Sequence, residues 1–369
     1  MADSKKYIGI YDTLEDVQDA LDNGQLSKPY VAKTMDNGQL DYNSLSPVDY
    51  SQYWCTYLPL DAKIWVITND DYFSSTTEYT GGDGKISKAD FPNFYRAGSY
   101  TYGNSTVEKF KYFQFDSTSN TSYFNNAWSN CSSLKSFPQL DLHNGTNFGY
   151  AWQNCSSLKE FPLIDTSKGT NFRSAWQGCS SLTEFPLIDT SNGTNFNRAW
   201  EGCSSLTEFP MLDVSKGTDF EQAWTGCSKL ASFPVLNLSK GTNFGYAWQN
   251  CSSLTSFPQM DLSSGTNFGY AWRDCSALTT IGQLDLSAAT DLGYAWQNCT
   301  SLTTLGGFGA IKESIDLSAS TLLTVESIMN VINQAATVEG KTMTLGSTNL
   351  AKLSDEQKAV ATSKGWTLA

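Results

Sequence analysis

Tryptophan recurs every 24 residues along the middle of the chain, and this spacing limits the fold more than any other feature. The period holds without a slip over eight copies, at Trp128, Trp152, Trp176, Trp200, Trp224, Trp248, Trp272 and Trp296. A cysteine follows each tryptophan by three residues, and a leucine follows each cysteine by three. A fixed period in the twenties is the signature of a solenoid, in which each coil buries its apolar side against its neighbours.

The residue types within the repeat predict the path of one coil. In six consecutive copies a proline comes directly after a phenylalanine, and proline cannot donate to a strand ladder. The strand is therefore expected to begin after the proline, for example over 139–142, with its leucines on one face and Gln139 and Asp141 on the other. Gly-Thr-Asn should then turn the chain, and residues 151–155 should form a short helical stretch.

The repeat unit also resembles a known family. Ala-Trp-x-x-Cys-x-x-Leu-x-x-Phe-Pro-x-x-Asp is similar to the BspA-like leucine-rich repeats of bacterial surface proteins, with Trp where that family usually has Phe or Met. The Asp-x-Ser-x-x-Thr-Asn portion resembles the repeats of Mycoplasma-type surface lipoproteins. The resemblance implies an α/β leucine-rich-repeat solenoid of about eight coils with a capping region at each end, and adhesion or recognition rather than catalysis.

Four regions are expected along the chain. Residues 1–50 resemble the amino-terminal pieces of virion proteins in phages of gut Bacteroidetes and would serve as an attachment segment. The other three are a β-rich cap domain over 51–104, the solenoid over 105–310 and an α/β cap over 311–369. The last of these is similar to the caps on such arrays, and its sequence predicts helices over 324–336 and 354–365 with a strand over 341–345.

Composition excludes several classes of function. The net charge of −13 argues against nucleic-acid binding, which needs a basic surface. No run of 18 apolar residues is present, so we expect no membrane insertion, and the amino terminus lacks the apolar stretch of a secretory signal. His143 is the single histidine and occupies a column that holds serine in later coils. We therefore expect no catalytic residues, no cofactor and no enzyme activity.

The cysteine and tryptophan columns have a structural interpretation. Lone cysteines 24 residues apart lack the close spacing of zinc sites, so we interpret them as a column of buried thiols. The tryptophans share the helical-type spacing of the cysteines and leucines, which predicts an internal aromatic spine whose indole N–H groups bond to the backbone. The state of Cys55, outside the array, is left open.

An acidic column leaves two alternatives open. Aspartates expected to face outward stand at one position of successive coils, namely Asp141, Asp165, Asp189, Asp213, Asp261 and Asp285, with Asn237 in the same column. Like charges on adjacent strands repel, so something must offset them. Each carboxylate could accept hydrogen bonds from the following Ser and Gly-Thr amides in an Asx-type turn, or the column could bind cations. We assign no metal site.

Positions that vary between coils are the candidates for recognition. They lie directly before Ala-Trp or one residue earlier, and the candidates are Tyr150, Arg173, Arg198, Glu221, Tyr246, Tyr270 and Tyr294. Exposed Tyr and Arg suit flat contacts with a glycan or a protein. The alternative is an ordinary solvated surface.

Together these features predict a non-enzymatic phage virion protein (tail or head fibre, decoration or adhesin) that displays a leucine-rich-repeat surface for host attachment. Its expected partners are other virion proteins, through residues 1–50, and a bacterial surface glycan or protein. The alternative is a bacterial cell-surface adhesin that binds host or glycan ligands, which should carry an export signal. The oligomeric state is left open, with a symmetric homo-oligomer as one option.

Overall fold

The computed structural model describes residues 124–137 and 142–369, together with six short strands in the preceding part of the chain. These strands are β1 (Val31–Thr34), β2 (Trp54–Thr56), β3 (Ile64–Thr68), β4 (Thr80–Gly82), β5 (Lys85–Ile86) and β6 (Gln114–Phe115). The first four form an antiparallel sheet in the order β1-β3-β2-β4, and β5 pairs with β6 in parallel. The rest of the expected attachment segment over 1–50, and Asp141, lie outside the described residues.

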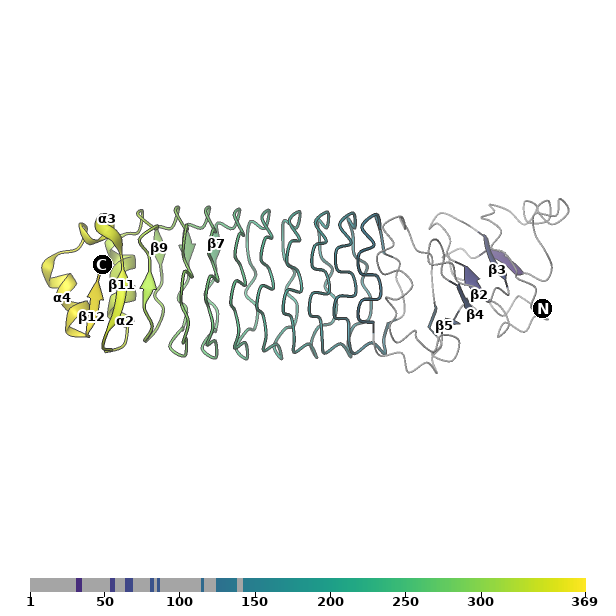
Figure 1. Cartoon of the computed structure of the whole chain (residues 1–369), viewed down its shortest axis with the longest axis horizontal. Coiled ribbons are helices and arrows are strands. Elements are labelled where there is room, and N and C mark those ends of the chain that lie inside the picture. The colour runs from purple at the N-terminus through teal and green to yellow at the C-terminus, as the bar shows by residue number, and fades with distance from the viewer. Residues whose placement is uncertain are drawn as a thin grey trace.

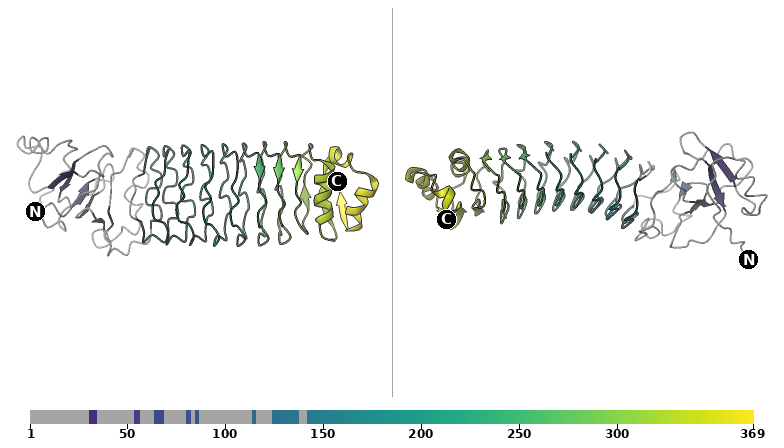
Figure 2. Two further views of the ribbon diagram at one scale, coloured as in Figure 1. Left: turned by 180° about the vertical axis from the view of Figure 1, so that it is seen from behind. Right: turned by 90° about the horizontal axis from the view of Figure 1, so that it is seen from above.

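The repeats form a single row of similar coils, one for each 24 residues, with the C-terminal helices at one end (Figure 1). Seen from above, the row bows gently (Figure 2). The tryptophans lie flat on one another along the inside. Their ring centroids are 5.2 to 5.9 Å apart from Trp128 to Trp296. The solenoid predicted from the repeat is confirmed.

Phenylalanines complete this aromatic core from two sides. Trp200, for example, stacks on Phe196 with the centroids 5.8 Å apart and meets Phe209 edge to face at 4.9 Å. Both phenylalanines stack in turn on their counterparts in adjacent coils. All three side chains are buried, so each coil covers the apolar surface of the next, which is the main stabilising term in a solenoid.

The predicted position of the strands is wrong. The array strands are β7 (Ser256–Phe257), β8 (Thr280–Ile281) and β9 (Thr304–Leu305), and they pair in parallel in that order. They end at the apolar residue that comes before the proline position, and in the segment after it the described residues show only the single bridge Met260↔Leu284. Because proline lacks an N–H, it stops the ladder instead of starting it.

The predicted short helix on the opposite side of the coil is also wrong. Residues 149–154 form consecutive tight turns. The N–H of Tyr150 donates to the carbonyl oxygen of Arg173 in the next coil at 2.7 Å, and that of Trp152 donates to Ala175 at 2.8 Å. Tyr150 and Asn154 both have a φ near +60°, which interrupts a right-handed helix. Alternate amides therefore join neighbouring coils.

The glycine of the Gly-Thr-Asn turn is required by packing. A Cβ atom added to Gly217 would lie 2.3 Å from the ring of Phe220, and the same short approach recurs at the equivalent glycines from Gly145 to Gly265. In the last regular coil both partners change together, since Ala289 occupies the glycine position and Leu292 the phenylalanine position. The smaller leucine leaves room for the alanine methyl group.

The C-terminal region closes one end of the array. It contains β10 (Ile315–Asp316), α2 (Val325–Gln334), β11 (Lys341–Thr344), α3 (Gly346–Leu350), α4 (Asp355–Ser363) and β12 (Trp366–Leu368). Strands β10, β11 and β12 form a parallel sheet. The two helices and the strand that the sequence predicts here are confirmed as α2, α4 and β11, whereas α3, β10 and β12 were not predicted.

Specific contacts hold this cap in place. Thr324 caps the N-terminus of α2, and Ser354 and Gln357 form a capping box on α4. Lys364 donates to three carbonyl groups at the C-terminal end of α2. Ser327 of α2 receives a hydrogen bond from the N–H of Leu305 in β9, so α2 covers the open edge of the last coil. Short parallel strands on one side, turns on the other and a capped end define a leucine-rich-repeat solenoid.

Candidate recognition surfaces

The cysteine column is buried in the core. All eight array cysteines are buried thiols that form no disulfide bond, and their side chains face the core. Each Sγ from Cys155 onward donates to the carbonyl oxygen of the preceding coil's tryptophan, as Cys203 does to Trp176 at 3.3 Å. Burial raises the pKa of Cys179, Cys227 and Cys299 to about 12. Such thiols resist ionisation, so this column fills space in the core rather than acting as a nucleophile.

The tryptophans face inward as predicted, but their indole N–H groups do not bond to the backbone. The Nε1 atoms of seven of them have no hydrogen-bond partner, those of Trp152, Trp176, Trp200, Trp224, Trp248, Trp272 and Trp296. Stacked and edge-to-face rings fill the surroundings of each indole. The tryptophan carbonyl oxygens are taken by the N–H and the thiol of cysteines. The free energy gained by stacking and burying the indole rings therefore exceeds the cost of leaving several of their N–H groups without a hydrogen bond.

The outward-facing aspartates all make the same local hydrogen bond. An Oδ1 atom accepts from the backbone N–H two residues later, at 2.9 to 3.1 Å for Asp165, Asp189, Asp213, Asp261 and Asp285. Asn237 makes the equivalent bond at 3.3 Å. This is the Asx turn of the first interpretation. Among the described residues, no cluster of three or more His, Cys, Asp or Glu side chains could hold a metal ion.

These hydrogen bonds stabilise the charged form of the carboxylates. The backbone N–H and then the hydroxyl of Ser167 lower the pKa of Asp165. The hydroxyl of Ser215 and then its N–H lower the pKa of Asp213, and Ser263 acts in the same way on Asp261. The serines that follow the aspartates therefore offset part of the repulsion along the column.

Three of the predicted recognition residues come together as a stack. The rings of Tyr246 and Tyr270 are 4.6 Å apart and nearly parallel, at 3°, and Tyr294 continues the stack at 5.0 Å from Tyr270. The guanidinium group of Arg273 lies 5.4 Å from the centre of the Tyr270 ring. Tyr294, at the end of the stack, is 52% exposed. We call Tyr246, Tyr270 and Tyr294 the tyrosine ladder.

The other predicted residues do not join this ladder. Arg173 lies over the ring of Tyr150 at 5.9 Å. Arg198 faces Glu201, with 3.8 Å between Nε and Oε2. Glu221 accepts hydrogen bonds from the side-chain amides of Asn197 and Asn243, at 3.1 and 3.4 Å. The predicted residues therefore do not form one continuous stripe. They form a cation–π pair (Tyr150 and Arg173), an ion pair (Arg198 and Glu201), hydrogen bonds from amides to Glu221, and the tyrosine ladder.

The backbone beneath these side chains is left-handed. Position 150 and its counterparts, including Arg198 and Tyr270, have φ between 52° and 60°. This conformation disfavours bulky residues. A second left-handed position in each coil holds only Asn, Gly or Asp, from Asn130 to Asn298. Every coil has this backbone conformation at this position. The backbone therefore does not explain why some coils carry Tyr or Arg there, and the contacts of those side chains must.

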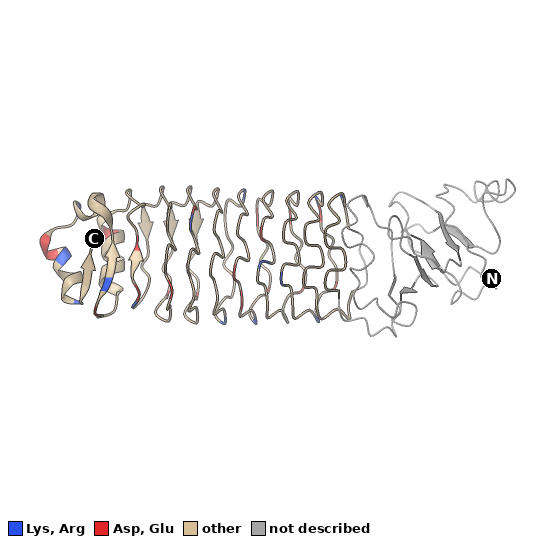
Figure 3. Ribbon diagram, in the orientation of Figure 1, with Lys and Arg blue, Asp and Glu red and all other residues tan. Residues whose placement is uncertain are grey.

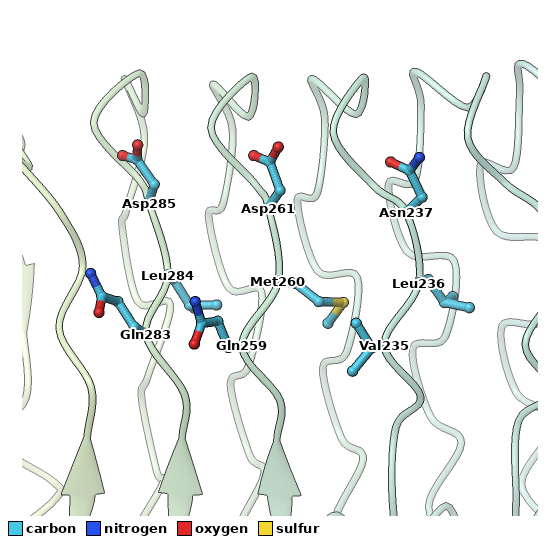
Figure 4. Close-up of a pocket in the computed structure, with 9 residues that line it drawn as sticks. All are labelled: Val235, Leu236, Asn237, Gln259, Met260, Asp261, Gln283, Leu284 and Asp285. Carbon is cyan, nitrogen blue, oxygen red and sulfur yellow. The ribbon is translucent and has the colours of Figure 1, made fainter.

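The sequence reasoning missed a column of exposed apolar side chains. Directly after the proline stand Leu163, Leu187, Met211 and Val235, which are 58 to 69% exposed. In the next coils Gln259 and Gln283 occupy this column, beside a shallow hollow that Met260 and Leu284 also line (Figure 4). The sequence did contain a signal for this exposure. The alternation predicted for 139–142 places Gln139, the first member of this column, on the same outward face as Asp141.

Charged side chains follow the same side of the coil. Glu160, Glu184 and Glu208 stand three residues before the exposed apolar column, and Asp165, Asp189 and Asp213 stand two residues after it. All six are exposed, and acidic residues recur along the described coils in Figure 3. The apolar column therefore runs between two acidic columns.

Comparison with known proteins returns solved structures of low similarity. A leucine-rich repeat protein from Bacteroides ovatus has 13% identity, covering 81% of this chain and 90% of its own, with a TM-score of 0.32. A leucine rich cell surface protein from Faecalibacterium prausnitzii has 17% identity, covers 77% and 86%, and has a TM-score of 0.27. An internalin from Listeria monocytogenes has 15% identity, covers 72% and 80%, and has a TM-score of 0.17.

The sequence matches no protein-family model and no curated protein. With TM-scores this low, the assignment of the fold rests on the coil geometry described above. None of the helices in the described part of the chain has the length and apolar character needed to cross a membrane.

Proposed function

We propose that this chain is a recognition protein without enzymatic activity, a phage virion component whose solenoid displays binding surfaces to a bacterial host. The observation that carries this proposal is the contrast between constant core columns and changing surface columns. Trp, Cys and Leu occupy the same positions in every coil, whereas the residue before Ala-Trp is Asn, Tyr, Ser, Arg or Gln. A scaffold repeated with different exposed side chains suits binding more than chemistry.

The tyrosine ladder is the surface that fits a glycan best. Its stacked rings cover one another's faces and so present a row of ring edges and phenol hydroxyl groups, and Arg273 adds a planar cation beside Tyr270. Phenol hydroxyl and guanidinium groups can form hydrogen bonds with sugar hydroxyls, and Tyr and Arg are enriched where proteins bind one another. The ladder would be the host-contacting part, and residues 1–50 would join the chain to the particle.

Mass spectrometry of purified phage particles tests the assignment to a virion. We expect peptides of this chain at constant stoichiometry with known capsid or tail proteins through a density gradient. Their absence from the particles, with the protein found in the outer surface fraction of bacteria, would instead support a cell-surface adhesin.

A glycan array tests the ladder itself. We expect the Tyr246→Ala/Tyr270→Ala variant to lose about ten-fold or more in affinity for any glycan that the unchanged protein binds, because two of the three rings and their hydroxyl groups are removed. The matched control is Arg198→Ala, at the same column outside the ladder. Equal binding by all three proteins would exclude the ladder as the glycan site.

A further inference from the structure

A second surface of the array has its own chemistry. It consists of Leu163, Leu187, Met211 and Val235, flanked by Glu160, Glu184 and Glu208 on one side and Asp165, Asp189 and Asp213 on the other, and we call it the acidic-flanked ridge. It arises from residues 160–165 and their counterparts in the following coils, on the side of the coil that holds Phe-Pro. The tyrosine ladder arises from the turns before Ala-Trp, so the two surfaces are separate.

The apolar part of the ridge is unusual for this protein. Among the described residues, six large apolar side chains are strongly exposed, and four of them form this one column. Their exposure ranges from 58% for Val235 to 69% for Met211. Isolated exposed leucines need no explanation, but a contiguous apolar strip rimmed by polar residues marks an interaction site.

The same column shows that the coil does not need these side chains. Gln259 and Gln283 take the position in later coils, which keep the same buried Trp, Cys and Leu columns. Ser256 and Thr280 likewise take the position of the three glutamates. The glutamates therefore occur only in the three coils that carry Leu163, Leu187 and Met211, whereas Val235 ends the apolar column between Ser232 and Asn237.

The charges on the ridge select the partner. No ion pair within the described residues involves any of the six flanking carboxylates. Lys168 and Lys216 help to lower the pKa of Asp165 and Asp213 through their charge, but their hydrogen bonds go to the side-chain oxygens of Asn144 and Asn192. Lines of like charge disfavour the isolated protein, and a cationic partner would relieve that repulsion while steering its own approach.

The spacing along the ridge selects the form of the partner. The phenylalanines two residues before the apolar column have ring centroids 5.9, 6.3 and 6.0 Å apart from Phe161 to Phe233, which gives the spacing of the coils on this side. An α-helix lying along the array repeats one face every ~5.4 Å, so about three turns would match these three intervals. Such a helix can carry an apolar stripe between two rows of Lys or Arg, which is the complement of an apolar column between two acidic columns.

We propose that the acidic-flanked ridge binds a cationic amphipathic helix of another protein, about three turns long, which lies along the array. A second copy of this chain is a poorer occupant, because each copy carries a net charge of −13 and would bring acidic columns against acidic columns.

A labelled amphipathic Leu/Lys peptide of about 14 residues is the probe, and its binding to the full chain is measured by fluorescence anisotropy. We expect Leu187→Gln/Met211→Gln to weaken binding about ten-fold, since Gln is the residue that this column carries in later coils. Glu184→Ser/Glu208→Ser should weaken it similarly and reduce its dependence on salt. Circular dichroism confirms that each variant keeps the melting profile of the parent.

Three controls separate this site from general attraction between opposite charges. A peptide of the same composition but scrambled order should bind about ten-fold more weakly. The Gln259→Leu/Gln283→Leu/Ser256→Glu/Thr280→Glu variant lengthens the ridge and should bind the peptide more tightly. Equal binding of the scrambled peptide, or binding unaffected by Leu187→Gln/Met211→Gln, would overturn the proposal. So would self-association of the chain that Leu187→Gln/Met211→Gln abolishes, because the occupant would then be a second copy.

Discussion

The first half of the regular array, residues 158–238, and the second half, residues 239–310, have the same interior and different exteriors. Both halves stack Trp on Trp and bury their cysteines. The first half carries the acidic-flanked ridge on the Phe-Pro side, and the second half carries the tyrosine ladder on the turn side. The comparison teaches that the core columns define the coil, while the exposed columns can be exchanged one coil at a time.

The halves also differ in how tightly the coils pair on the Phe-Pro side. In the first half the bond from Thr207 N–H to the carbonyl oxygen of Thr183 is 3.5 Å long, whereas Thr279 donates to Thr255 at 2.9 Å in the second half. Prolines follow the phenylalanines of the first half, but Gly282 and Gly306 take that position later and donate to Phe257 and Ile281. The strands β7, β8 and β9 lie in the half where glycine restores the missing donor.

The largest predicted effect is a loss of stability at alkaline pH, and it tests whether the cysteine columns of the two halves are equally buried. We expect the protein to lose stability steeply above pH ~8.5, the ordinary thiol pKa. Because burial raises the pKa of Cys179, Cys227 and Cys299 to about 12, their stabilising contribution is complete below pH ~8.5 and is lost as the pH rises toward the folded value. Above pH ~8.5 each such thiol lowers the free energy of unfolding by roughly 1 kcal/mol per pH unit, and the contributions of several thiols add.

Thermal unfolding between pH 7 and 10 measures this loss, in a Cys55→Ser background. Cys203→Ala in the first half and Cys275→Ala in the second should reduce the alkaline sensitivity by the same amount, since burial raises the pKa of both thiols. A thiol that titrates near its ordinary pKa while the protein stays folded would show that the column is not sealed.

The next effect concerns the glycine–phenylalanine pair that closes each turn. Gly217→Ala should lower the free energy of unfolding by about 1–3 kcal/mol, because the new methyl group would lie 2.3 Å from the ring of Phe220. Adding Phe220→Leu should recover part of this loss, because it recreates the Ala289 and Leu292 pair of the last regular coil. Urea unfolding of the two single variants and the double variant measures the coupling. Strict additivity would contradict the packing explanation.

The sequence predicted the interior far better than the path of the backbone. The 24-residue period identifies Trp, Cys and Leu as core because burial follows from periodicity and residue type alone. The strand and the short helix were misplaced because their hydrogen bonds join different coils. The left-handed turn at Tyr150 carries no sequence signal, because its column also accepts Arg and Ser. The column of Asn154 does carry one, because it holds only Asn, Gly or Asp, the residues that favour a positive φ.

The surfaces were predicted only in part for a related reason. The variable residues before Ala-Trp were recognised, but their grouping into the tyrosine ladder depends on three tyrosines in consecutive coils with glycine before each. The exposed column from Leu163 to Val235 was missed because apolar residues in a repeat suggest core. The indole N–H prediction failed since a flat stack of rings leaves no room for an acceptor.

A smaller difference in the free energy of unfolding is expected when the residue at the left-handed turn position is replaced in each half. Arg198→Asn should raise the free energy of unfolding by up to ~1 kcal/mol, because asparagine tolerates the positive φ and the exposed pair with Glu201 contributes little. Tyr270→Asn gains the same relief but loses its stacking on Tyr246 and Tyr294, so its net change should be near zero. Urea unfolding of both variants measures the difference, and equal stabilisation would mean that the ladder contributes nothing to folding.

The smallest effect compares Asp213 of the first half with Asn237 in the same column. Asp213→Asn should change the melting temperature at pH 7 by about 1 °C or less, because asparagine keeps an acceptor for the N–H of Ser215, as Asn237 does for Ser239. Asp213→Ala removes the acceptor and should cost about 1 kcal/mol.

The pH dependence and the effect of calcium then identify what the column does. Since Ser215 lowers the pKa of Asp213, the stability from this bond is present above the unfolded pKa of ~3.9 and is lost as the pH falls through the lower folded value. Asp213→Asn should remove that part of the acid sensitivity. We expect calcium or EDTA to shift the melting temperature of neither protein, because the N–H of Ser215 already bonds to the carboxylate of Asp213. A calcium-dependent rise in the unchanged protein that Asp213→Asn abolishes would reverse this conclusion.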